Sequence, residues 1–232
     1  MKPTKKVLTP IYGSETNKYN GSDYKYKKEA QNIMNFFIGN SNVKGVVLTL
    51  PYIFCIVEKA IRKINKNLTF LGVECIEDTF KKMKKVIETE NLPIKPYFGK
   101  IQDKIFGAKE NAYAHLILDY CGCLSTYLDE IRYALRHKIV KKNGYVCMTF
   151  SVPIISNVGN HKLVKDNGRY ECNNKNDNRS LCEKGIHETI CKVMGEDYDI
   201  VKLFKYKDTK IDKKGNLHRG MPMILIIVKR IK

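Results

Sequence analysis

The chain has 232 residues, of which 43% are hydrophobic and 28% are charged. These ordinary proportions exclude a largely disordered chain, and the length suits one α/β domain with a buried core. Its 42 Lys and Arg against 24 Asp and Glu give a net charge of +18, which attracts polyanions such as nucleic acids unless the lysines only solvate the surface.

The first predicted element is a helix that follows a polar N-terminal segment. Prolines and glycines interrupt residues 1–22, which also carry several lysines, so we expect a basic arm there. Apolar side chains then recur at helical spacing over residues 23–38, between Ser22 as the N-cap and Gly39 as the stop. We expect this helix to open a single domain that extends over residues 23–232.

Short apolar segments along the next part of the chain predict buried strands. They lie at residues 45–50, 68–74, 95–99, 115–118 and 144–151. Segments that are apolar throughout, rather than alternating, are typical of strands covered on both faces. Because amphipathic stretches of helical length separate most of them, the order predicts a parallel sheet with right-handed crossovers.

The C-terminal part of the chain predicts a different arrangement. Residues 157–179 are rich in Asn, Lys, Asp and Gly, which favours a long polar loop insertion. A helix is expected over about residues 180–194, and the apolar segments 198–206 and 221–228 flank a polar turn, the pattern of an antiparallel hairpin. The sequence therefore predicts a three-layer α/β sandwich around a mostly parallel seven-stranded sheet that ends in an antiparallel hairpin.

The cysteines and the apolar runs bear on the compartment. The chain has 8 cysteines, and they lack the dense, even spacing of a secreted disulfide scaffold, so we expect the cytoplasm or another reducing intracellular compartment. No signal peptide is recognisable at the start of the sequence. The longest apolar stretch, residues 45–57, is too short to span a bilayer and contains Pro51, so we expect no membrane association.

Polar side chains follow the predicted strands at the points where ligands bind in such sheets. Glu74 ends the second strand and Asp119 ends the fourth, while Gln102 and Asp103 come shortly after the third. In open parallel sheets, ligands bind outside the carboxyl ends of the strands, where the winding of the sheet reverses. We expect Glu74 and Asp119 at this rim of the sheet.

This order of elements, over about residues 23–231, resembles the Rossmann-like class I S-adenosylmethionine-dependent methyltransferases. The resemblance implies S-adenosylmethionine as the cofactor. It implies that Glu74 accepts hydrogen bonds from the ribose hydroxyls of this cofactor, and that Gln102 and Asp103 contact its adenine ring. The alternative for Glu74 is an acid that only complements the dipole of the following helix.

Asp119 and Tyr120 match the position at which amino-methylating members of the family carry a motif of Asp or Asn, two prolines and an aromatic residue. Here the sequence is Asp119-Tyr120-Cys121-Gly122, with the aromatic residue but without the prolines. The resemblance implies that Asp119 and Tyr120 form the catalytic part of the site, and that Asp119 orients the substrate or the methionine amine. The alternative is that Asp119 caps the next helix.

The first strand departs from the family pattern. The family carries a glycine-rich loop there, which lets the backbone approach the cofactor, whereas this chain continues from Thr49 with Leu50, Pro51 and Tyr52. Two interpretations follow. The chain is a methyltransferase that acts on DNA or RNA and contacts the cofactor with a different loop at Leu50 to Tyr52, or it is a catalytically inactive protein of the same fold that binds nucleic acid or serves as a scaffold.

Two further kinds of site, a zinc site and a cysteine nucleophile, are not expected. The potential zinc ligands Cys172, Cys182, His187 and Cys191 lie in one region, but they contain no Cys-x-x-Cys pair, so we predict no metal. A cysteine nucleophile at Cys121 or Cys123 would need an orienting acid and an oxyanion motif, and the sequence offers neither at a recognised spacing.

Overall fold

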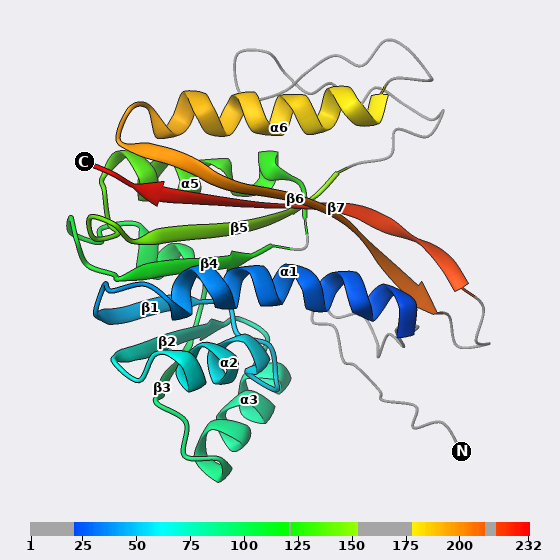
Figure 1. Ribbon diagram of the computed structural model, residues 1–232. Coiled ribbons are helices and arrows are strands. Elements are labelled where there is room, and N and C mark those ends of the chain that lie inside the picture. The colour runs from blue at the N-terminus through cyan, green and yellow to red at the C-terminus, as the bar shows by residue number, and fades with distance from the viewer. Residues whose placement is uncertain (1–20, 121, 153–177, 212–216) are drawn as a thin grey trace.

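The computed structural model describes residues 21–120, 122–152, 178–211 and 217–232 (Figure 1). The helices are α1 Gly21–Gly39, α2 Ile56–Ile64, α3 Glu77–Thr89, α4 Gln102–Ile105, α5 Leu124–Arg136 and α6 Asn178–Met194. The strands are β1 Gly45–Thr49, β2 Leu68–Glu74, β3 Ile94–Phe98, β4 His115–Asp119, β5 Tyr145–Ser151, β6 Tyr198–Ile211 and β7 Leu217–Arg230.

All the strands belong to one seven-stranded sheet in the order β3-β2-β1-β4-β5-β7-β6. The first five strands along the chain pair in parallel, and β7 runs antiparallel to both β5 and β6. The predicted parallel sheet with a terminal antiparallel hairpin is therefore confirmed. Its winding reverses between β1 and β4, because the chain builds outward from β1 through β2 to β3 and then returns to β4 on the other side.

Side chains that alternate along the central strands form two cores, one on each face of the sheet. On β1, for example, Leu48 packs with α5 and α6, whereas Val47 packs with α1, α2 and α3. Figure 1 shows α5 and α6 on one side of the sheet and α1, α2 and α3 on the other. The predicted three-layer sandwich is confirmed, and each large aliphatic side chain in these cores contributes about 1.5–3 kcal/mol by its burial.

Some boundaries differ from those predicted. The strands β6 and β7 are longer than their apolar segments, because backbone pairing continues through polar residues as far as Ile211 and Leu217 (Figure 1). The short helix α4 was not predicted, since four residues are too few to show a periodic pattern. The predicted arm at residues 1–22 lies almost wholly outside the described residues, as does most of the predicted insertion at residues 157–179.

His115 makes the stability of this fold sensitive to acid. The residue is fully buried on β4, and its Nδ1 accepts a hydrogen bond of 3.0 Å from the backbone N–H of Tyr145. Burial lowers its pKa to about 4, from an ordinary value of 6.5. Because the folded state resists this protonation, its contribution is complete above about pH 6.5 and is lost as the pH falls toward 4.

We therefore expect His115 to remove about 2–3 kcal/mol from the free energy of unfolding between pH 7 and pH 4.5. Urea unfolding at both pH values measures this loss. In His115→Gln, the free energy of unfolding should fall by about 2–3 kcal/mol less than in the native chain. The matched control is His137→Gln, which changes an exposed histidine and should keep the loss seen in the native chain. Equal losses in the native chain and in His115→Gln would contradict the assignment.

Candidate functional site

The carboxyl edge of the sheet is shaped first by the connection between β1 and α2. Pro51 is buried, and it packs on β2 at Gly72, where an added Cβ atom would lie 2.7 Å from the Cγ atom of Pro51. Cys55 then turns the chain into α2 with a left-handed backbone conformation, at a φ of 47°. The connection therefore follows a path set by a proline seated on a glycine of the neighbouring strand, in place of a glycine-rich loop.

The residues on either side of Pro51 complete this connection. The backbone N–H of Leu50 donates to the carbonyl of Ile117 at 3.2 Å, so the pairing of β1 with β4 continues one residue beyond the strand. The rings of Tyr52 and Phe54 meet edge to face at 6.2 Å, and Phe54 is 38% exposed. The role of Leu50, Pro51 and Tyr52 in cofactor binding stays a prediction.

Glu74 lies at the end of β2 and is largely buried, with 8% of its surface exposed. Its Oε1 accepts a hydrogen bond of 2.8 Å from the backbone N–H of Ile76, next to the start of α3. Burial raises the pKa of this carboxyl, and hydrogen bonds from the backbone of Ile76 and Cys75 oppose that rise. Glu74 is thus held at the strand end by the chain itself, and its role as a ribose ligand stays a prediction.

Gln102 and Asp103 both bind other parts of the protein. The side-chain amide of Gln102 donates to Oε1 of Glu130 on α5 at 2.7 Å, and Oδ2 of Asp103 accepts from the backbone N–H of Lys100 at 2.9 Å. Burial raises the pKa of Glu130, which is 3% exposed. The predicted contacts of Gln102 and Asp103 with an adenine ring are not tested by this arrangement.

Asp119 belongs to a pair of hydroxyl–carboxyl contacts on adjacent strand ends. The hydroxyl of Thr149 on β5 donates to Oδ1 of Asp119 at 2.5 Å, across the directly paired positions of β4 and β5. On the other side, the hydroxyl of Thr49 at the end of β1 donates to Oε1 of Glu58 at 2.6 Å. Two carboxyls, Asp119 on β4 and the buried Glu58 on α2, therefore lie at the ends of the central strands, and each accepts a hydrogen bond from a threonine.

The sequence reasoning missed Glu58, Thr49 and Thr149. The signal for Glu58 was present, because it shares the buried face of α2 with Val57 and Ile61, and an acid on an apolar helix face requires a partner. Glu58 is 2% exposed. Burial raises the pKa of its carboxyl, and the negative charge of Asp119 raises it further. The threonines carried no such signal, since Thr is common in strands.

Tyr120 lies in the core beneath this edge. Its ring is 3% exposed and stacks on Tyr127 with ring centroids 3.9 Å apart and an interplanar angle of 8°. Gly122 leaves the space for that stack, because an added Cβ atom would lie 2.9 Å from the ring of Tyr127. The sequence predicts that Tyr120 contacts the substrate, and this stays a prediction for a ring that here packs between β4 and α5.

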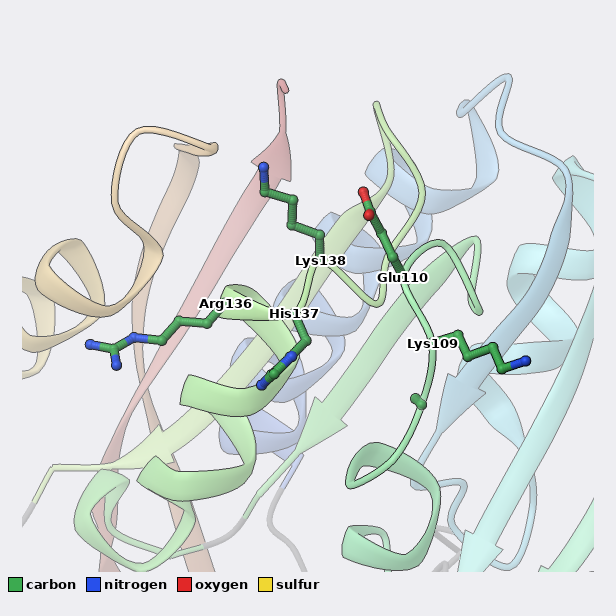
Figure 2. A pocket seen from close by; sticks show the side chains of 6 residues that line it. Lys109, Glu110, Arg136, His137 and Lys138 are labelled. Atoms are coloured by element: carbon green, nitrogen blue, oxygen red, sulfur yellow. The ribbon is translucent and has the colours of Figure 1, made fainter.

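A hollow of about 540 Å³ lies at the opposite edge of the sheet. Its lining residues are Ala108, Lys109, Glu110, Arg136, His137 and Lys138. Figure 2 shows Lys109 and Arg136 directed away from each other, so their charges do not converge on one ligand. Lys138 pairs with Asp197 at 2.9 Å and Glu110 with Arg230 at 2.6 Å, so these charges already serve the fold.

The described part of the chain holds no group of three or more His, Cys, Asp and Glu that could bind a metal ion. The Sγ atom of Cys191 lies 3.9 Å from the ring nitrogens of His187, one helical turn away on α6. Cys172 and the side chain of Cys182 lie outside the described residues. Among the helices that the structure describes, none combines the length and apolar character needed to cross a membrane.

The architecture is similar to that of several solved structures. No protein-family model matches the sequence, and no curated protein matches it. Among solved structures, TYW2 from Pyrococcus horikoshii in complex with MeSAdo has a TM-score of 0.57 at 11% identity, with 96% of this chain and 70% of that chain covered. TYW2 from M. jannaschii in complex with AdoMet has a TM-score of 0.51 at 13% identity, with 100% and 89% covered.

A putative rRNA-methylase from Clostridium thermocellum is similar to the same degree, with a TM-score of 0.51 at 10% identity over 89% of this chain and 96% of that one. These likenesses, together with the strand order and the reversed β7, define the class: the chain has the fold of class I S-adenosylmethionine-dependent methyltransferases. At these identities the likeness establishes the fold alone.

Proposed function

We propose that this protein is an S-adenosylmethionine-dependent methyltransferase that acts on nucleic acid. The observation that carries the proposal is the placement of Glu74 and Asp119 at the ends of β2 and β4, on either side of β1, where the winding of the sheet reverses. Ligands of open α/β sheets bind at this point. TYW2 from M. jannaschii, which has the same fold, was solved with AdoMet.

The residues at the strand ends fit the parts of this cofactor. Glu74 would accept hydrogen bonds from the ribose hydroxyls, and Asp119 would bind the positively charged amine of the methionine part. Gln102 and Asp103 would border the adenine ring, and the backbone from Leu50 to Tyr52 would border the methionine chain. Of the ion pairs within the described residues, none includes Glu74 or Asp119, so these acids are not neutralised by a lysine or arginine there.

When bound, S-adenosylmethionine supplies a methyl group on a sulfonium that is already a good leaving group. The protein therefore needs no nucleophile of its own, and its contribution is to hold the acceptor atom in line with the methyl group. Asp119 ends β4 and is partly exposed, so it would also orient an acceptor N–H or O–H. Thr149 fixes the carboxylate of Asp119 for either task.

The choice of nucleic acid as the substrate rests on charge. The net charge of +18 favours phosphate-rich substrates, and most of the surplus is lysine, which suits sequence-independent attraction to the backbone. The similar protein from Clostridium thermocellum carries the description rRNA-methylase. A flat affinity for short RNA and DNA between 50 and 200 mM salt would argue against a nucleic-acid substrate.

A second candidate function is favoured by one observation. Pro51 fills the space above Gly72 at the position of the family's glycine-rich loop, which would block the methionine part of the cofactor if the loop kept this path on binding. The protein would then bind nucleic acid without catalysis. The two candidates differ in one property that is simple to measure, the transfer of a labelled methyl group.

The test is transfer of tritiated methyl groups from S-adenosylmethionine to RNA, DNA or protein from a cell extract. We expect label in RNA or DNA. The variant Glu74→Ala should bind the cofactor about 10- to 100-fold more weakly than the native chain, which is the equivalent of one or two charge-assisted hydrogen bonds. The matched control is Glu77→Ala, which removes an exposed acid from the start of α3. Label in no polymer, with a folded protein, would favour the non-catalytic candidate.

A further inference from the structure

The side chain of Glu58 on α2 contacts the end of β1, at the carboxyl edge of the sheet. Thr49, the last residue of β1, donates its hydroxyl to Oε1 of Glu58 at 2.6 Å. Thr49 pairs with Ile117 on β4, so Asp119 lies two residues farther along the neighbouring strand, on the same side of the edge. Glu58 and Asp119 are near enough for the charge of Asp119 to raise the pKa of Glu58.

Within the described residues, neither acid of this pair forms an ion pair with a lysine or arginine. The groups that face Glu58 are the Thr49 hydroxyl, the Asp119 carboxyl, the Cys55 thiol and the ammonium of Lys59. Lys59 is bound to Glu90 at 2.6 Å, and burial raises the pKa of Cys55 to about 12, so this thiol stays neutral. A second buried negative charge beside Asp119 is costly, and Glu58 therefore retains a proton in the free protein to higher pH than an ordinary glutamate.

We propose that Glu58 is a positioning residue that acts through Thr49 and Asp119 to hold the ammonium group of S-adenosylmethionine at the ends of β1 and β4. Glu58 is 2% exposed, so its carboxyl would not contact the cofactor. Its negative charge, together with that of Asp119, balances the positive charge of the ligand, and its bond to Thr49 fixes the strand end beside the ligand. This inference rests on the proposed function.

One consequence separates this role from a merely structural one. Burial is the main cause of the raised pKa of Glu58, and the charge of Asp119 adds to it. When the ammonium approaches Asp119, it neutralises this added contribution, so the pKa of Glu58 falls and part of the population releases its proton to the solvent. Binding of the cofactor should therefore release protons near the raised pKa that Glu58 has in the free protein, and the release should fade as the pH rises above that pKa. By linkage, the affinity should rise with pH over the same interval.

The test is calorimetric titration of the full chain with S-adenosylmethionine, in pairs of buffers that differ in ionisation enthalpy. The variant Glu58→Gln keeps an acceptor for Thr49 but has no proton to release. We expect proton release in the native chain and none in the variant. Above the pH at which the release fades, the affinity of the variant should be about tenfold lower, the equivalent of one pKa unit. The matched control Glu88→Gln, which changes an exposed acid on α3, should behave as the native chain does.

Two further ligands show which positive charge Glu58 serves. S-adenosylhomocysteine keeps the amine but lacks the sulfonium charge, and we expect it to release protons as the cofactor does. 5′-Methylthioadenosine lacks the amine, so its affinity should be the same for Glu58→Gln and the native chain, without proton release. Proton release that requires the sulfonium would overturn the assignment to the amine.

The outcomes distinguish this inference from the proposed function. If the native chain binds S-adenosylmethionine without proton release, and Glu58→Gln binds it equally well, the positioning role is wrong while the cofactor site stands. If the folded native chain does not bind S-adenosylmethionine at all, both are overturned. The free energy of unfolding of Glu58→Gln at pH 7.5 should equal or exceed that of the native chain, because the variant removes a buried acid, so weak binding cannot be attributed to misfolding.

Discussion

The variant Asp119→Asn should bind S-adenosylmethionine about 10- to 100-fold more weakly than the native chain, with little change in stability. Asparagine has the same size, and its side-chain oxygen can accept the hydrogen bond that Thr149 donates to Asp119. The variant therefore removes the negative charge and keeps the geometry of the strand end. A charged partner contributes about 1.5–3 kcal/mol to such a contact, which sets the expected loss.

Calorimetric titration at constant ionic strength measures this loss. The matched control is Asp129→Asn, an acid on α5 whose side chain is 82% exposed and which pairs with Arg132 one turn away. We expect its affinity for the cofactor to equal that of the native chain. An Asp119→Asn variant that binds as tightly as this control would show that Asp119 does not bind the cofactor amine and only supports Thr149.

The largest expected effect on stability follows from Arg230, near the C-terminal end of β7. Its side chain is 4% exposed, and its guanidinium donates to oxygens of the chain that belong to Glu110, Asn111, Lys138, Val140 and Lys232. These contacts join the last strand to the connections before β4 and β5. Replacing Arg230 with Met would leave buried carbonyl groups without donors and Glu110 without its cation, which we expect to cost about 3–5 kcal/mol.

Urea unfolding followed by circular dichroism measures this cost. Arg132→Met provides the comparison, since Arg132 is more exposed and forms one ion pair on α5, and such surface pairs are worth less than about 1 kcal/mol. If Arg230→Met is too unstable to purify, Asn111→Gly removes one of the acceptors, tolerates the left-handed backbone of this position (φ 62°), and should cost about 1 kcal/mol. A loss below 1 kcal/mol in Arg230→Met would contradict the role assigned to this side chain.

The sheet was predictable because its strands are buried on both faces. Continuous apolar runs such as residues 68–74 and 144–151 are hard to place anywhere else in a globular fold, and the helical stretches between them dictated parallel pairing. The positions of Glu74 and Asp119 followed from the same reasoning, because each ends a strand that was recognised. These parts of the site depend on topology, which local sequence patterns determine well.

The rest of the site depends on contacts that local patterns do not report. Gln102 was expected to face a ligand, but its partner Glu130 is 28 residues away, and only the folded chain brings the two together. Glu58 and Thr49 are likewise joined by the return of α2 over β1. Tyr120 directly follows Asp119, yet the turn at the end of β4 sends its ring into the core.

The central claim is that the carboxyl edge of the sheet binds S-adenosylmethionine despite the loop at Pro51. Titration of the native chain with this cofactor in a calorimeter tests the claim most directly. We predict one cofactor bound per chain with micromolar affinity, which corresponds to about −8 kcal/mol. No binding at millimolar cofactor, by a protein that still unfolds cooperatively in urea, would contradict the claim and show that Pro51 closes the site.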